Sequence, residues 1–187
     1  KIKQMKKKYY ITTPIYYPSA KPHMGHAYSS ISADFIARYK RLEGFDVEFV
    51  TGTDEHGQKI QKSAKKNDLS PLEFCNKISK VFLDLGKVLN LSNTDFIRTT
   101  ENRHYKTVQK LWKILEENKF IYLSKYSGWY SISDEAFYSE TEIIDKENIK
   151  FCEATGSVVE WVEEESFFFK LSKFQDILIK HYKDNPD

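Results

Sequence analysis

Residues 9–60 decide the fold, and they read YYITTPIYYPSAKPHMGHAYSSISADFIARYKRLEGFDVEFVTGTDEHGQKI. Residues 9–13 are β-branched or aromatic and a proline follows them, which predicts a strand. From Ala27 onward apolar residues recur at helical spacing until Gly44, a residue type that often ends a helix, and residues 47–50 form a second short strand. The apolar residues of this helix are Ile31, Phe35, Ile36, Tyr39 and Leu42. Strand, helix and strand in this order predict a parallel α/β unit.

The alternation of strands and helices continues beyond this stretch. Residues 70–73, Ser-Pro-Leu-Glu, form a capping box with proline at the first helical position, so a helix starts there. Residues 95–99 have the composition of a third strand, and residues 101–118 have the spacing of another amphipathic helix. The first part of the chain, residues 1–119, is therefore predicted to be an α/β domain with a parallel sheet.

The second part of the chain has a pattern rich in β-strands. We predict a hairpin that turns at Ser127–Gly128 and further strand over residues 156–172. A last helix is predicted from Ser172, with Gln175 completing its capping box. Residues 120–187 are therefore expected to form a smaller, β-rich part.

Composition narrows the class of protein without naming a function. The 187 residues are 40% apolar and 30% charged, the net charge is +2, and no apolar run approaches the roughly 20 residues that cross a bilayer. The chain starts with basic residues but lacks the apolar segment of a secretory signal, and its two cysteines are too few for a disulfide framework. A cytoplasmic protein with no membrane partner is the expectation, and so small a net charge argues neither for nor against nucleic acid.

The histidines of Pro-His-Met-Gly-His, residues 22–26, lie between the first predicted strand and the first predicted helix. Ligands of open parallel sheets bind beyond the carboxyl ends of the strands, and a helix N-terminus favours phosphate. His23 and His26 are three residues apart, so both can face one ligand, and imidazole can donate to phosphate oxygens. Gly25 lets a ligand approach the backbone. The alternative is a turn that happens to contain histidines.

Asp54 and His56 follow the second predicted strand, so they open at the same edge of the sheet as the histidine loop. Asp54 could instead cap the helix that follows, and His56 could be purely structural. The sequence contains no Gly-x-Gly-x-x-Gly and no Gly-Lys-Ser/Thr. Their lack counts against a dinucleotide site and against a P-loop.

Residues 22–26 resemble the His-x-Gly-His element of class I aminoacyl-tRNA synthetases and of related nucleotidylyltransferases. The whole of residues 9–60 resembles the methionyl-tRNA synthetase family, and a weaker similarity continues to about residue 186. The resemblance implies that residues 1–119 are the first half of a Rossmann-like nucleotide-binding catalytic domain and that residues 120–187 are a connective insert. It also implies an aminoacyl-tRNA ligase that activates methionine with ATP and Mg²⁺ and transfers it to tRNA(Met).

The resemblance assigns roles to the residues of two loops. His23 and His26 would be catalytic, stabilising the phosphorus as the methionine carboxylate attacks it, and together with Gly25 they would bind ATP. Asp54 would take the methionine ammonium group. The full set of residues that would bind methionine is Thr13, Pro14, Ile15, Asp54 and His56.

The chain departs from the family in the insert, where many members carry a zinc knuckle made of Cys-x-x-Cys pairs. Ser131, Asp134 and Thr155 stand at three of the four cysteine positions, and Cys152 at the fourth. One thiolate, one carboxylate and two hydroxyls make a poor zinc site, so no structural zinc is expected. Cys152 and Cys75 are then expected to be small core residues.

The second half-sheet of the family and its Lys-Met-Ser-Lys-Ser loop do not occur in the sequence. The chain is therefore expected to be an N-terminal piece of a longer enzyme and to be inactive alone. Two alternatives remain open. One is a small-substrate nucleotidylyltransferase with the same histidine element, and the other is a non-catalytic tRNA-binding protein derived from a synthetase. The sequence predicts no oligomeric state.

Overall fold

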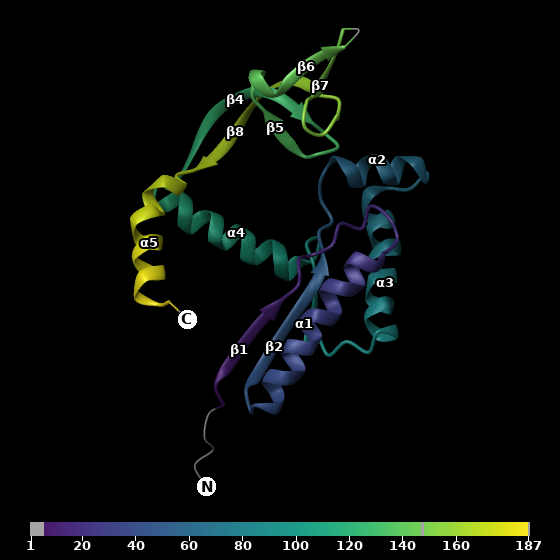
Figure 1. The fold of residues 1–187 in the computed structure, drawn as a ribbon, viewed down its shortest axis with the longest axis vertical. Coiled ribbons are helices and arrows are strands. Elements are labelled where there is room, and N and C mark those ends of the chain that lie inside the picture. Colours follow the sequence, from purple (N-terminus) through teal and green to yellow (C-terminus); the bar gives the residue numbers. More distant parts are fainter. Residues whose placement is uncertain (1–5, 147, 187) are drawn as a thin grey trace. The chain divides into compact units, whose positions relative to one another are not determined.

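The computed structural model describes residues 6–146 and 148–186. The chain forms two compact units, residues 1–106 and residues 107–187, and helix α4 (Asn102–Glu117) runs from one into the other (Figure 1). No helix among the described residues is long and apolar enough to span a membrane. The assignment of the two parts as a catalytic half-domain and an insert stays a prediction.

The first unit is built on a parallel three-stranded sheet in the order β1-β2-β3. This sheet confirms the predicted α/β class. The elements of the unit, in chain order, are β1 (Lys8–Thr12), α1 (Met24–Leu42), β2 (Asp46–Thr53), α2 (Gln58–Lys66), α3 (Pro71–Val88) and β3 (Asp95–Arg98).

Helices α1 and α3 cover the same face of this sheet (Figure 1). Ala33 and Ala37 of α1 pack against Val47 and Phe49 of β2, and the aromatic and aliphatic side chains of α3 pack against Phe96 of β3. The register places Phe96 on the same face as Val47 and Phe49. Both helices therefore lie on one side, as right-handed crossovers between parallel strands require.

Helix α1 is confirmed, but it buries a different face from the one its apolar pattern predicted. The predicted apolar residues are exposed, from 40% for Ile36 to 87% for Leu42. Small side chains contact the sheet instead, and Ala33 and Ala37 let the helix approach β2 closely. The buried residues of the helix are Ser30, Ala33, Asp34 and Ala37.

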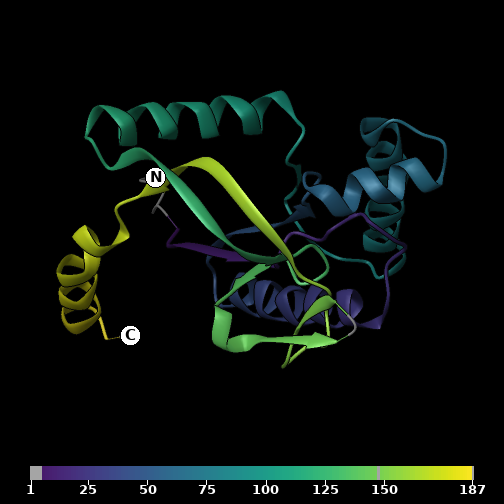
Figure 2. The same ribbon diagram turned by 90° about the horizontal axis from the view of Figure 1, so that it is seen from above.

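The second unit contains an antiparallel sheet in the order β5-β4-β8 and a separate hairpin of β6 and β7. Figure 2 shows the long strands β4 and β8 running side by side. The elements after α4, in chain order, are β4 (Ile121–Ser131), β5 (Ala136–Tyr138), β6 (Ile143–Lys146), β7 (Ile149–Cys152), β8 (Glu160–Phe169) and α5 (Gln175–Asp184), with short 3₁₀ turns at Glu140–Glu142 and Leu171–Phe174.

The predicted hairpin at Ser127–Gly128 is wrong, because both residues lie inside the continuous strand β4. Gly128 is paired with Val162 of β8, and a side chain on it would come within 3.3 Å of the Phe137 ring. The glycine therefore serves the packing of an aromatic residue rather than a turn. The chain reverses later, between β4 and β5, where Glu135 has a positive φ of 53°.

The predicted start of the last helix at Ser172 is also wrong. A 3₁₀ turn precedes α5, whose N-cap is Phe174 without a side-chain capping bond. The ring of Phe174 packs against Phe120 and Phe169 at centroid distances of 4.8 and 5.1 Å. Packing of this ring decides the local conformation in place of the capping box with Gln175.

Candidate active site

Helix α1 begins with a capping box made of two imidazole rings. His23 is the extended N-cap residue, and its Nδ1 accepts a hydrogen bond from the Gly25 N–H at 3.1 Å. The Nδ1 of His26 accepts one from the His23 N–H at 3.0 Å. The two histidines thus satisfy backbone donors that a helix N-terminus otherwise leaves without partners.

This cap fixes the chemistry of the remaining ring nitrogens. A neutral imidazole that accepts at Nδ1 carries its proton on Nε2, so Nε2 of each ring is a donor. The pKa of His26 is lowered by burial and by the neighbouring His23, which favours the neutral form of this ring. The ring centroids of His23 and His26 lie 3.9 Å apart. The loop therefore presents two N–H donors side by side.

Gly25 is required by the cap itself. A Cβ atom at this position would lie 2.9 Å from Cε1 of His23, closer than carbon atoms approach one another without strain. Any larger residue would push the imidazole away from the helix end. The glycine that the sequence assigned to ligand approach therefore also makes room for the capping ring.

Tyr16 joins the histidine loop to the end of β2, and sequence reasoning missed it. Its N–H donates to the Gly52 carbonyl at 2.9 Å, and its own carbonyl accepts from the Asp54 N–H at 2.9 Å. Its ring meets the edge of His26 at 4.7 Å between centroids. Its hydroxyl is hydrogen-bonded to the Ser30 hydroxyl at 2.9 Å. Tyr16 therefore brings Asp54 and the histidines onto one framework.

The residues predicted to line the methionine pocket differ in what they can offer. The side chain of Thr13 is buried, and its hydroxyl is hydrogen-bonded to the Thr51 hydroxyl at 2.7 Å. Pro14 is exposed, and Ile15 is 38% exposed. Thr13 can therefore contribute only backbone groups, whereas Ile15 can contribute apolar surface.

Asp54 and His56 lie in the irregular segment between β2 and α2. The N-cap of α2 is Gly57, with a φ of 104°, so the alternative that Asp54 caps this helix is wrong. Its carboxylate is partly exposed and has no hydrogen-bonding or ionic partner within residues 6–146 and 148–186. His56 is exposed and has its Nε2 3.4 Å from the Thr99 carbonyl oxygen.

A second acidic residue of this segment, Glu55, escaped the sequence analysis. Its side chain is fully buried and pairs with Arg98 of β3, with 2.7 Å between Oε1 and Nε. Burial alone would raise its pKa, but hydrogen bonds from Arg98, Ser79, Thr100 and Thr53 outweigh burial and lower the pKa to about 2. Only the tertiary structure reveals this role, because Asp-Glu-His has no burial signal in the sequence.

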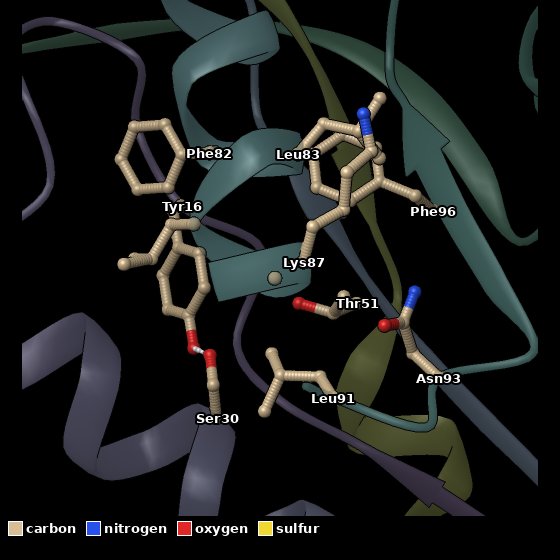
Figure 3. Close-up of a pocket in the computed structure, with 11 residues that line it drawn as sticks. Tyr16, Ser30, Thr51, Phe82, Leu83, Lys87, Leu91, Asn93 and Phe96 are labelled. Atoms are coloured by element: carbon tan, nitrogen blue, oxygen red, sulfur yellow. Dashed lines mark hydrogen bonds between the residues drawn. The ribbon is translucent and has the colours of Figure 1, made fainter. Parts of the chain in front are cut away.

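A cavity of about 210 Å³ lies between α1, α3 and the sheet (Figure 3). Figure 3 shows the Tyr16 hydroxyl pointing to Ser30 at its wall, and most of the remaining lining is apolar, including Phe82, Leu91 and Phe96. None of the residues predicted to bind ATP or methionine lines this cavity. It is a partly open pocket beside Tyr16 and does not coincide with the predicted site.

The four positions at which many members of the family carry zinc ligands do come together in the second unit. The Asp134 carboxylate accepts hydrogen bonds from the hydroxyls of Thr155 at 2.7 Å, Ser157 at 2.7 Å and Tyr138 at 2.9 Å. Cys152 and Ser131 beside it are fully buried. The described residues contain no group of three or more His, Cys, Asp or Glu that could hold a metal ion.

Both cysteines are unpaired and buried, as expected of small core residues. Burial raises the pKa of Cys75 to about 11. The thiol of Cys75 faces the Glu55 carbonyl oxygen at 3.8 Å. The absence of structural zinc stays a prediction.

Known proteins resemble this chain along almost all of its length. The family described as "tRNA synthetases class I (M)" matches residues 9–187. The methionine–tRNA ligase of Rickettsia prowazekii (strain Madrid E) is 54% identical over 183 residues, which cover 98% of this chain and 35% of that protein. The ligase of the same name from Bacillus subtilis (strain 168) is 49% identical over 185 residues, covering 95% of this chain and 28% of that protein.

A solved structure shows the same similarity. Mycobacterium tuberculosis methionyl-tRNA synthetase in complex with methionyl-adenylate superposes with a TM-score of 0.89 at 44% identity, covering 97% of this chain and 36% of that chain. The chain therefore spans about a third of the length of the relatives that it matches.

Proposed function

The chain belongs to the class I (M) tRNA synthetases, and on this premise we propose that the full-length gene product is a methionine–tRNA ligase. It joins methionine to ATP to give methionyl-adenylate and pyrophosphate, and then transfers the methionyl group to the terminal ribose of tRNA(Met). The relatives of that name and the solved relative with bound methionyl-adenylate support this activity. The observation that carries it in this chain is the reciprocal histidine cap, since it leaves two donors on a loop that Tyr16 ties to Asp54.

In the first half-reaction, a carboxylate oxygen of methionine attacks the α-phosphorus of ATP. The bond from this phosphorus to the bridging oxygen breaks, and pyrophosphate leaves. The Nε2–H groups of His23 and His26 donate to phosphate oxygens on which negative charge grows in the transition state. Gly25 completes the ATP-binding loop because a side chain there would displace the His23 ring. No protein nucleophile is needed, so positioning and charge stabilisation supply the catalysis.

Mg²⁺ belongs to the ATP substrate in this proposal. The ion usually keeps several water ligands and binds phosphates together with one or two carboxylates. The described residues offer no cluster of three or more potential metal ligands. The phosphate oxygens of ATP and water molecules would therefore supply most ligands of the ion.

Methionine binds on the Asp54 side of the loop. The partly exposed Asp54 carboxylate pairs with the ammonium group, a charge-assisted contact of the stronger kind. His56 lies beside it, and Ile15 offers apolar surface. Thr13 and Pro14 contribute backbone groups, because the Thr13 hydroxyl is already bonded to Thr51.

The proposal predicts the outcome of two matched substitutions in the full-length gene product. Asparagine at position 23 or 26 keeps an acceptor where Nδ1 stood, and so keeps the cap, but it removes the Nε2–H donor. We expect His23→Asn and His26→Asn each to lower the kcat of methionine-dependent ATP–pyrophosphate exchange about a hundredfold with little change in thermal stability. Glutamine carries an N–H near the Nε2 position but loses the cap, so it should retain more activity and melt earlier.

Two controls separate the proposal from its alternatives. Exchange that depends on methionine, and not on leucine or isoleucine, identifies the substrate. Lack of exchange with any amino acid would support a non-catalytic tRNA-binding protein. Full activity of both asparagine variants would remove the histidines from the reaction. The 187-residue chain alone is expected to show no exchange.

A further inference from the structure

The Glu55 carboxylate accepts five hydrogen bonds, and no atom of its side chain is exposed. Arg98 donates twice, from Nε to Oε1 at 2.7 Å and from Nη2 to Oε2 at 2.9 Å. The hydroxyls of Thr53, Ser79 and Thr100 donate at 2.7, 2.5 and 2.5 Å. All lone-pair directions of the carboxylate are thus engaged by side chains with defined positions.

These donors come from separate parts of the first unit. Thr53 ends β2, Ser79 lies in α3, Arg98 ends β3, and Thr100 follows β3. The backbone of Glu55 is also held, because its N–H donates to Thr99 Oγ1 at 2.8 Å. Glu55 therefore fixes the irregular segment after β2 to the helix and the strand on either side of it.

The segment that Glu55 holds carries the two side chains proposed to meet methionine. Neighbouring side chains of an extended chain point to opposite sides, and Glu55 points inward. Asp54 is partly exposed and His56 is exposed, on either side of it. The direction of both side chains follows from where Glu55 is anchored.

An ion pair is a costly way to fill this space if packing is its only purpose. Removing two charged groups from water costs more free energy than burying two apolar side chains of similar size. Directional hydrogen bonds to a carboxylate, however, fix the orientation of the chain in a way that apolar contacts do not. The bidentate fork of Arg98 suits this purpose because it holds a carboxylate plane in one orientation. Its second contact, from Nη2 to Asn76 Oδ1 at 2.7 Å, fixes the guanidinium in turn.

We propose that the buried Glu55–Arg98 pair is a positioning device that holds the Asp54 carboxylate where it meets the ammonium group of the amino-acid substrate. This inference rests on the proposed role of Asp54. Glu55 itself touches no reacting atom. Its contribution is made through the geometry of its neighbour, so it should affect methionine more than ATP.

The first unit offers a matched control for this idea. Asp34 of α1 is also buried, with 11% of its side chain exposed, and pairs with Arg38 at 2.7 Å. It accepts further bonds from the N–H and hydroxyl of Ser92 at 2.6 and 2.5 Å. Its partners include none of the residues of the proposed site, so Asp34→Asn removes a similar charge without disturbing Asp54.

The test compares Glu55→Gln and Asp34→Asn in the full-length gene product by amino-acid-dependent pyrophosphate exchange. Glu55→Gln is expected to raise the KM for methionine about tenfold and to leave the KM for ATP within about twofold. Asp34→Asn is expected to change neither KM. An unchanged KM for methionine in Glu55→Gln, or an equal rise in Asp34→Asn, would overturn the inference.

Arg98→Lys keeps the test decisive if Glu55→Gln does not fold. Lysine keeps the positive charge but loses the bidentate fork, so a selective rise in the KM for methionine is again expected. Hydrogen–deuterium exchange provides a readout that needs no activity: peptides covering residues 54–57 should exchange faster in Arg98→Lys and Glu55→Gln but not in Asp34→Asn. Unchanged exchange there in both variants refutes the positioning role. Faster exchange in the variants, together with a wild-type enzyme that does not activate methionine, refutes only the proposed function.

Discussion

Glu55 in the first unit and Asp134 in the second unit are both hubs of hydrogen-bond networks, and the two carboxylates are held in different ways. Glu55 in the first unit is fully buried and is neutralised by the Arg98 guanidinium. Asp134 in the second unit is bound by hydroxyls, and within residues 6–146 and 148–186 it has no cationic partner. Hydrogen bonds from Thr155 and Ser157 nevertheless lower the pKa of Asp134 to about 2, the same value as for Glu55.

The comparison shows that a low pKa alone does not reveal what a carboxylate does. Hydroxyls rotate, so the network around Asp134 can rearrange when the acceptor changes. A guanidinium offers only donors in a fixed plane, so Arg98 cannot adapt to the loss of Glu55. The hydroxyl network of Asp134 connects two loops of the second unit, whereas the Glu55–Arg98 pair fixes one segment in one orientation beside the proposed site.

The largest effect is expected from Glu55→Gln, which leaves the Arg98 charge without its partner. Removing one member of a buried ion pair should lower the free energy of unfolding of the first unit by about 3 kcal/mol. Protection of the β2 amides, measured by hydrogen–deuterium exchange in the full-length gene product, reports this unit alone. A loss below about 1 kcal/mol would show that Arg98 does not depend on Glu55.

The stabilisation that Glu55 provides should depend on pH, and the direction of this dependence follows from its pKa. The pKa of Glu55 is lowered from 4.5 to about 2, so the stabilisation is fully present above the unfolded-state pKa and is lost as the pH falls toward the folded-state value. The difference in free energy of unfolding between wild type and Glu55→Gln should therefore become smaller as the pH falls from 4.5 to about 2. A difference that stays constant over this pH range would mean that the charge of the Glu55 carboxylate does not contribute to stability.

A smaller and more local effect is expected from Asp134→Asn. The asparagine carbonyl can still accept from one or two of the three hydroxyls, and the remaining hydroxyls can turn to the new amide. Faster exchange should be confined to residues 131–138 and 152–157, with β2 unchanged. Loss of protection as large as that of Glu55→Gln would contradict the idea of an adaptable network.

Chelation tests whether this hub works without a metal. One thiol and one carboxylate, Cys152 and Asp134, are the only potential zinc ligands at the four knuckle positions. Treatment with a strong chelator should therefore leave the exchange of the same peptides unchanged. Stoichiometric zinc whose removal unfolds them would refute the prediction.

Local sequence patterns predicted the parts of the first unit that depend on local chemistry. Strands and helices followed from β-branched runs, helical spacing and the Ser70 capping box, which forms as predicted. The position of the histidine loop followed from the order of these elements, because strand ends of a parallel sheet lie at one edge. The family resemblance added the roles of the residues in that loop.

Features that depend on tertiary packing could not be read from the sequence. The buried face of α1 is set by how closely Ala33 and Ala37 let the helix approach β2, and Gly128 is explained by a ring nine residues later in the chain. Tyr16 and Glu55 carry no local signal, since their partners come from distant elements. Sequence reasoning thus proposed residues that would face a ligand and missed those that hold the two loops in place.

The protonation of the two histidines tests the central claim most directly, namely that one ring nitrogen caps α1 while the other serves the substrate. Isotope-labelled histidine in the full-length gene product, assigned with His23→Asn and His26→Asn, reports each nitrogen by NMR in slightly alkaline solution. The account predicts unprotonated Nδ1 and protonated Nε2 in both rings, and a shift of the Nε2–H signals when a stable methionyl-adenylate analogue binds. Protonated Nδ1 atoms, or Nε2–H signals that do not respond to the analogue, would contradict it.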